Sequence, residues 1–159
     1  MKTVLTIAGF DPSGGAGIMA DLKVFSDFGV SGVSVITALT AQNSKRVEAV
    51  WPVPSDFVRK ECEALLEDMK LSAVKIGMLA TGQTVRTIRK LIEGYRLKNI
   101  VLDPLFVSTS GYPLLAQSAI KEMKKLIPLA DVLTPNLSEA ALLTGLDVQT
   151  PADRESAAR

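Results

Sequence analysis

Continuous apolar runs alternate along this chain with segments in which apolar residues recur every three or four positions. The first pattern is typical of strands that are buried on both faces, and the second of helices with one buried face. Strands are predicted near residues 4–8, 33–40, 47–53, 73–79, 99–105 and 131–134. Helices are predicted between most of these strands and after the last one. The alternation favours an α/β fold in which helices cover both faces of a mostly parallel sheet.

Several helix ends are marked by local signals. Ser55 is a predicted N-cap, and Asn136 with Glu139 three residues later forms the pattern of a capping box. Another helix is predicted to begin near Thr81. Gly145 is placed as a helix stop because a left-handed residue often follows a last helical turn, and glycine adopts that conformation without strain.

The length of 159 residues and the apolar share of 47% are enough to bury one core, so we expect a single domain over residues 1–159. No linker, repeat or low-complexity segment interrupts it. From Pro151 to Arg159 the chain runs through good helix formers without a stop signal. We therefore expect these residues to be the front part of a longer fold that is incomplete at the C-terminus.

Charge and apolar run lengths exclude several classes of protein. The 18 basic and 17 acidic residues are intermixed, which predicts solvated helix faces and no nucleic-acid partner. No apolar stretch approaches the roughly 20 residues of a membrane span. The N-terminal apolar run ends at Phe10 without a cleavage pattern, which argues against secretion.

The sequence has no histidine and one cysteine, so it offers neither a disulfide framework nor a metal cluster of the usual kind. Cys62 falls on the apolar stripe of a predicted helix. We interpret it as a small buried hydrophobic residue and not as a reactive thiol. A reducing, cytoplasmic location is expected.

A glycine-rich loop joins the first strand to the first helix. Gly14, Gly15 and Gly17 allow positive φ angles and a close approach of a ligand to the backbone. The next lysine is Lys23, so the lysine that ends a Walker A loop is missing and that class is excluded. The stretch 15–20 does fit a dinucleotide-binding pattern, but the following strand ends without an acid for a ribose hydroxyl. Both of these phosphate-binding classes are therefore disfavoured for the loop.

Polar residues follow the predicted strands at the edge where parallel strands end and α/β proteins bind ligands. Gln42 offers both a donor and an acceptor, which suits the edge of a heteroaromatic ring, and Asp103 suits Mg²⁺ or a hydroxyl group. Each has a simpler alternative. Asp103 precedes Pro104 and could initiate a turn, and the pair Asn136 and Glu139 could serve only as a helix cap.

Five motifs in order along the chain carry a resemblance to a known family. They are A-G-F-D-P-S-G-G-A-G-I-M-A-D-L-K (8–23), T-A-L-T-A-Q-N (37–43), K-I-G-M-L (75–79), V-L-D-P-L-F-V-S-T-S-G (101–111) and T-P-N-L-S-E-A-x-x-L-T-G (134–145). Together they resemble the hydroxymethylpyrimidine and phosphomethylpyrimidine kinases of thiamine biosynthesis, which belong to the ribokinase-like superfamily. The resemblance covers the whole chain.

The resemblance implies a cytoplasmic, homodimeric enzyme that uses ATP and Mg²⁺. It would phosphorylate the hydroxymethyl group of a small pyrimidine and then the resulting monophosphate. The residues it implies for substrate binding are Gly9, Asp21, Gln42, Met78 and Leu105. Those it implies for metal or phosphate are Asp103, Asn136 and Glu139. An alternative interpretation of Met78 is that it is a core residue at the end of a strand.

Departures from the family pattern qualify this expectation. Phe10 replaces a common serine, and Phe106 and Tyr112 are bulky, so the pocket is expected to be trimmed. The family's second glycine-rich turn, with the catalytic base and the grip on the ATP phosphates, is not found and is expected beyond Arg159. No catalytic residue is therefore assigned, and these 159 residues alone are expected to be inactive.

Two alternatives to this function stay open at this point. A pyridoxal kinase of the same superfamily would act on a similar ring. A noncatalytic module would bind the pyrimidine without any dependence on nucleotide.

Overall fold

The computed structural model describes residues 1–108 and 111–158, and its strands and helices alternate as the hydrophobic pattern predicts. Thr109 and Ser110, which belong to one of the five motifs, lie outside the described residues. The strands are β1 (Thr3–Phe10), β2 (Ser31–Gln42), β3 (Val47–Pro52), β4 (Leu71–Ile76), β5 (Ile100–Leu102) and β6 (Val132–Leu133). The helices are α1 (Gly17–Asp27), α2 (Ser55–Asp68), α3 (Gly82–Tyr95), α4 (Ile120–Leu126), α5 (Leu137–Thr144) and α6 (Pro151–Ala158), with short 3₁₀ helices η1 (Gln117–Ala119) and η2 (Ile127–Leu129) beside α4.

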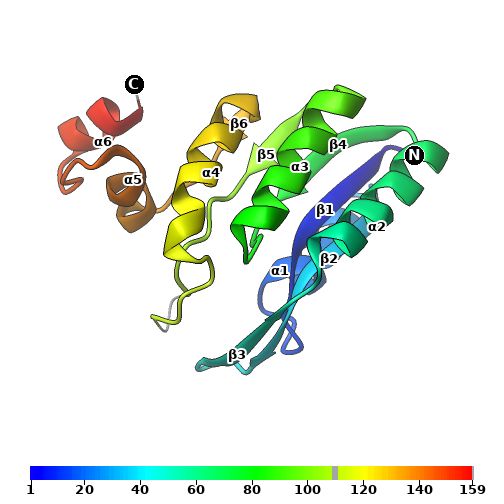
Figure 1. Ribbon diagram of the computed structural model, residues 1–159, viewed down its shortest axis with the longest axis horizontal. Coiled ribbons are helices and arrows are strands. Elements are labelled where there is room, and N and C mark those ends of the chain that lie inside the picture. Colours follow the sequence, from blue (N-terminus) through cyan, green and yellow to red (C-terminus); the bar gives the residue numbers. More distant parts are fainter. Residues whose placement is uncertain (109–110, 159) are drawn as a thin grey trace.

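The six strands form one sheet in the order β3-β2-β1-β4-β5-β6 (Figure 1). Strands β2, β1, β4, β5 and β6 run parallel, and only β3 pairs antiparallel with β2. The predicted mostly parallel sheet is confirmed. The chain leaves β1 toward β2 on one side and returns to β4 on the other, so the strand order reverses at β1. Open α/β sheets bind ligands beyond the carboxyl ends of the strands at such a point.

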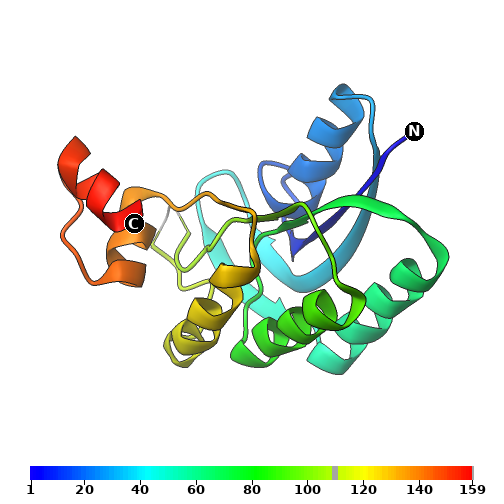
Figure 2. The same ribbon diagram turned by 90° about the horizontal axis from the view of Figure 1, so that it is seen from above.

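Helices cover the sheet on two sides. Figure 2 shows α2, α3 and α4 along one face and α1 on the opposite face. The main core lies under α2, α3 and α4, where Leu5, Ile76 and Leu102 of the strands are fully buried beside Ile88 and Met123 of the helices. Burial of each such side chain contributes about 1.5–3 kcal/mol relative to exposure. This core fixes the strands whose ends carry the polar groups.

Helix ends follow the predicted signals with one exception. Thr81 caps α3 by accepting a hydrogen bond from the Thr84 backbone N–H at 3.1 Å. Gly145 ends α5 in the left-handed conformation, with φ of 77°. The prediction that Ser55 caps α2 is wrong, because the helix already includes Ser55 and its N-cap is Pro54, which makes no side-chain cap.

Some elements near the C-terminus are shorter than predicted. Strand β5 ends at Leu102, since Pro104 has no N–H to continue the ladder, although the Asp103 N–H still donates to the Ile76 carbonyl at 2.8 Å. Helices α5 and α6 lie at one end of the sheet (Figure 1), and α6 contains no buried residue. Among the described residues, no helix combines the length and the apolar character needed to cross a membrane.

Candidate functional site

A cavity of about 940 Å³ lies at the carboxyl ends of the strands on either side of β1. The glycine-rich loop, the turn between β2 and β3, the segment after β5 and the start of α5 form its wall. Six of the eight residues predicted for the site line it: Gly9, Gln42, Met78, Leu105, Asn136 and Glu139. The other two, Asp21 and Asp103, are not part of the lining formed by the described residues.

Asp11 organises the glycine-rich loop from within. Its carboxylate accepts hydrogen bonds from the Ser13 backbone N–H at 2.8 Å, the Ser13 hydroxyl at 2.7 Å, and the backbone N–H groups of Gly15 at 3.1 Å and Ala16 at 3.0 Å. Burial alone would raise the pKa of Asp11, but these donors outweigh it and hold the pKa below its ordinary value. The backbone N–H groups of Ser13, Gly15 and Ala16 are thus already bonded within the loop and are not free to bind an anion.

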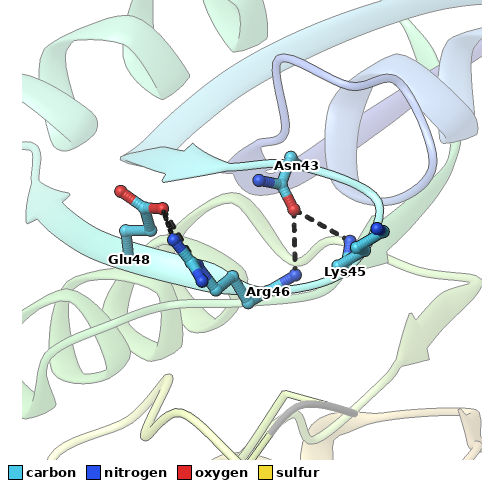
Figure 3. Close-up of polar contacts among 4 residues, drawn as sticks. All are labelled: Asn43, Lys45, Arg46 and Glu48. Atoms are coloured by element: carbon cyan, nitrogen blue, oxygen red, sulfur yellow. Dashed lines mark hydrogen bonds and ion pairs between the residues drawn. The ribbon is translucent and has the colours of Figure 1, made fainter.

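The opposite wall is the turn between β2 and β3 (Figure 3). The Asn43 side-chain oxygen accepts from the backbone N–H groups of Lys45 at 2.9 Å and Arg46 at 3.1 Å. The Arg46 guanidinium donates to Glu48 at 2.7 Å, a pair that is well exposed and contributes little to stability. Gln42 stands at the end of β2, directly before this turn, and lines the cavity.

Met78 serves the core and the cavity together. It is buried in a small apolar cluster with Ala38 and Ala80, and its sulfur lies 3.0 Å from where a Cβ on Gly9 would stand. Gly9 therefore has to lack a side chain for Met78 to keep this position. Phe10 and Phe106 also line the cavity, whereas Tyr112 is not part of its described lining.

Asp21 of α1 points at the face of the sheet. Its Oδ2 accepts from the Thr6 hydroxyl at 2.6 Å and from the Lys75 ammonium at 3.0 Å. Thr6 and Lys75 are opposite each other in the pairing of β1 with β4, so both side chains stand on the same face. Lys75, and not Asp21, reaches the cavity wall.

Asp103 lies at the end of β5 and is half-buried. Burial raises its pKa, the Lys75 charge and a hydrogen bond from the Thr134 side chain lower it, and the Asp21 charge raises it, with a net rise. The ion-paired charges of Lys75 and Asp21 thus both act on the Asp103 carboxylate. Residues of β4 and α1 therefore influence the charge of the carboxylate that follows β5.

Asn136 and Glu139 form the predicted capping box at the start of α5. The Asn136 side chain accepts from the Glu139 backbone N–H at 2.9 Å, and Glu139 Oε2 accepts from the Asn136 backbone N–H at 2.8 Å. Glu139 is only 4% exposed, and its Oε1 is buried without a hydrogen-bond partner in the described structure. Burial raises the pKa of Glu139; the Asn136 and Phe106 backbone N–H groups oppose the rise and the Asp103 charge adds to it.

An unpaired carboxylate oxygen beside a cavity fits an oxygen-seeking cation such as Mg²⁺. Within the described residues, no group of three His, Cys, Asp or Glu side chains could hold a metal by itself. Mg²⁺ commonly takes one or two carboxylates and completes its shell with waters and phosphate oxygens. The donor set therefore fits a cation that arrives with a phosphorylated ligand.

Sequence reasoning missed the part played by two residues. Asp11 occupies the loop amides itself, and Lys75 carries the positive charge of the cavity floor. The signal for Lys75 was present, because it is a single cation within the apolar strand that precedes Gly77. A charge in such a strand predicts a buried partner.

The fold and site define a ribokinase-like α/β protein with a small-molecule cavity at the sheet's topological switch point. The family model described as phosphomethylpyrimidine kinase matches residues 11–159. The chain belongs to the phosphomethylpyrimidine kinase family.

Individual relatives agree with this membership. The chain is 42% identical over 156 residues to the hydroxymethylpyrimidine/phosphomethylpyrimidine kinase of Aquifex aeolicus, which covers 98% of this chain and 61% of the relative. The crystal structure of phosphomethylpyrimidine kinase from Clostridium difficile is similar with a TM-score of 0.92 and 45% identity, over 99% of this chain and 68% of that one. Pyridoxal kinase from Staphylococcus aureus in complex with AMP-PCP and pyridoxal is similar with a TM-score of 0.86 and 34% identity, over 99% of this chain and 57% of that one.

The chain spans only part of the curated relatives that it matches, for example 61% of the Aquifex aeolicus enzyme and 53% of the Escherichia coli enzyme. The similarity therefore establishes the family and the fold of these residues.

Proposed function

We propose that the protein carrying these residues is an ATP-dependent kinase of 4-amino-5-hydroxymethyl-2-methylpyrimidine and of its monophosphate in thiamine biosynthesis. One observation carries the proposal: a single cavity joins the groups suited to a pyrimidine ring, Gln42 and Met78, to the free buried oxygen of Glu139. The activity named for the relatives at 42–46% identity supports the same substrate class.

The acceptor ring would lie between the loop and the turn that follows β2. Gln42 supplies a donor and an acceptor for the aminopyrimidine edge, and Met78 packs on the ring face. Gly9 lets the ring approach the backbone, and Leu105 contributes main-chain groups to the wall. Asp21, which is held by Thr6 and Lys75, would act at the margin of this pocket.

The nucleotide end of the cavity would be at α5. Glu139, whose Oε1 is buried without a hydrogen-bond partner in the described structure, would offer this oxygen to a Mg²⁺ ion, and the charge of Asp103 would add to the site. Asn136 fixes the Glu139 backbone. When bound, the ion neutralises charge on the phosphates during transfer. The residues of this chain hold the acceptor in place and supply oxygen ligands.

We also propose that these 159 residues alone do not turn over substrate. The last glycine in the sequence is Gly145, which ends α5, so no second glycine-rich turn follows the capping box. A base to take the acceptor proton is not assigned among the described residues. The test compares ADP release, with ATP, Mg²⁺ and the pyrimidine, for this chain and for the complete gene product. Turnover by the 159 residues contradicts their inactivity, and no turnover by the complete product contradicts the kinase proposal.

A pyridoxal kinase is the second candidate, favoured only by the likeness to the Staphylococcus aureus structure. Competition assays with pyridoxal and the pyrimidine, at equal concentration on the complete gene product, separate the two. A noncatalytic pyrimidine-binding module would show binding in calorimetry and no effect of nucleotide.

Assembly and location complete the proposal. We expect a homodimer, and the exposed pair of Leu39 and Trp51 across β2 and β3, 38% and 65% exposed, offers apolar surface for it. Light scattering of the complete gene product tests this expectation. A cytoplasmic location agrees with the free, buried Cys62.

A further inference from the structure

Lys75 is held in an unusual position for a lysine. Its side chain is 22% exposed, its ammonium lies 3.0 Å from Asp21 Oδ2, and it stands on the floor of the cavity. A Cβ on Gly77 would come within 3.0 Å of the ammonium nitrogen. The absence of a side chain at Gly77 therefore makes room for the charge.

The other cations of the cavity differ from Lys75. Lys45 and Arg46 belong to the exposed turn after β2, and Arg46 is already paired with Glu48. Of the three cationic residues in the described lining, Lys75 alone is anchored to the sheet and partly buried. It is therefore the cation that a ligand at the cavity floor would meet.

The charges around Lys75 leave it able to bind an anion. Asp21 uses one of the three ammonium donors and shares its oxygen with Thr6. Asp103, which the Lys75 charge also influences, is not part of the described cavity lining. Of the acids in the lining, Asp11 is already bonded to loop amides. Protein kinases use a lysine that is paired with a carboxylate to bind phosphates, so an ion pair does not prevent this role.

The two proposed phosphate acceptors, the hydroxymethylpyrimidine and its monophosphate, differ at one group. The first has a neutral hydroxyl group where the second has a charged phosphate. The hydrogen bond between an ammonium and a phosphate joins two opposite charges. It is therefore stronger than a hydrogen bond between an ammonium and a neutral hydroxyl group. The ring contacts proposed for Gln42 and Met78 would be the same for both acceptors.

We propose that the Lys75 ammonium binds the phosphate of the monophosphorylated pyrimidine and so determines the preference for the second acceptor. The inference rests on the proposed function. Asp21 orients the ammonium, and Gly77 provides its space.

The experiment is calorimetry on the complete gene product without nucleotide, so that no transfer occurs. The probes are 4-amino-5-hydroxymethyl-2-methylpyrimidine and its monophosphate, and the variants are Lys75→Met and Lys60→Met. Lys60→Met removes the same charge from an exposed position on α2, outside the cavity lining. In Lys75→Met, we expect the Kd of the monophosphate to rise about tenfold or more and that of the pyrimidine to change less than about threefold. In Lys60→Met, both should stay within about threefold.

The outcomes separate the two proposals. An equal loss for both probes in Lys75→Met would mean that Lys75 only supports the pocket, and no loss would mean that it does not meet the phosphate; either result overturns the inference while leaving the kinase proposal intact. Wild-type protein that binds neither probe overturns both. If Lys75→Met does not fold, Lys75→Gln repeats the test with a neutral side chain that is still polar.

Discussion

The Cα of Gly17 lies so close to the carbonyl of Gly9 that a Cβ at position 17 would stand 2.2 Å from the Gly9 oxygen. Gly17 also has φ of 56°, in the left-handed region. The first residue of α1 thus packs directly on the end of β1. The geometry of the glycine-rich loop depends on this contact, because the loop residues lie between these two glycines.

Gly17→Ala should therefore destabilise the fold strongly. The new methyl group meets backbone, which cannot rotate away, and alanine is strained at this φ. We expect a loss of roughly 2–4 kcal/mol in the free energy of unfolding. Urea denaturation followed by circular dichroism measures it.

Gly94→Ala is the matched control. Gly94 lies within α3, has no atom within 4 Å of the position of a Cβ, and is not in the left-handed region. Alanine lowers the entropy of the unfolded chain and suits a helix, so a gain of about 0.5–1 kcal/mol is expected. An equal loss of unfolding free energy in the two variants would show that the close contact between Gly17 and Gly9 does not determine the stability.

Asp11→Asn tests how much the Asp11 carboxylate stabilises the glycine-rich loop. An amide offers one acceptor oxygen where the carboxylate serves four donors, so we expect a loss of about 2 kcal/mol at pH 7. The folded pKa lies below the ordinary 3.8, so the contribution is complete above pH 3.8 and is lost as the pH falls through the folded pKa. The difference between wild type and variant should shrink over that range. Asp27→Asn, at an exposed position, serves as the control in the same titration.

The local elements were largely readable from the sequence because their signals are local. Helix α5 was predicted with both of its ends, since the capping box and Gly145 lie within the helix and its flanks. The prediction that Ser55 is the N-cap of α2 was wrong because Pro54 takes the N-cap position and Ser55 is already the first residue of the helix. Strand β5 was overestimated because the apolar run continues past Pro104, where the ladder stops.

The site was only partly readable for a physical reason. Residues at strand ends were predicted to meet because parallel strands share an edge, and Gln42, Met78 and Glu139 do line one cavity. The pairing of Asp21 with Lys75 joins positions 54 residues apart and depends on the register of β1 and β4 under α1. No local pattern encodes that register.

Cys62 should be inert in the folded protein. It is 1% exposed, and burial first, then the charges of Glu61 and Glu63, raises the pKa of its thiol to about 12. The thiolate is the reactive form, and at pH 8 it would be about one part in ten thousand. We expect no reaction with a disulfide reagent at pH 8 in native buffer and complete reaction in denaturant. Rapid labelling of the native protein would contradict the buried position.

Glu139→Gln separates the cap from the proposed metal site. The amide oxygen can still accept from the Asn136 backbone N–H, so the variant should fold, but the free carboxylate oxygen is gone. In the complete gene product, we expect nucleotide binding to lose its dependence on Mg²⁺, because a neutral amide is a poor ligand for this ion. Glu139→Ala should lose the cap as well, at about 1 kcal/mol, and Glu67→Gln, exposed on α2, should change neither property.

The same carboxylate sets a pH dependence. The pKa of Glu139 is raised above its ordinary 4.5, and a protonated carboxyl does not bind Mg²⁺. As the pH is lowered toward 4.5, the affinity for Mg²⁺ should therefore begin to fall earlier, at a higher pH, than it would if the ligand were an exposed glutamate. Calorimetric titration of Mg²⁺ with a nonhydrolysable ATP analogue, at a series of pH values, measures this. A Glu139→Gln protein with the wild-type Mg²⁺ response would show that the free oxygen of Glu139 does not meet the metal.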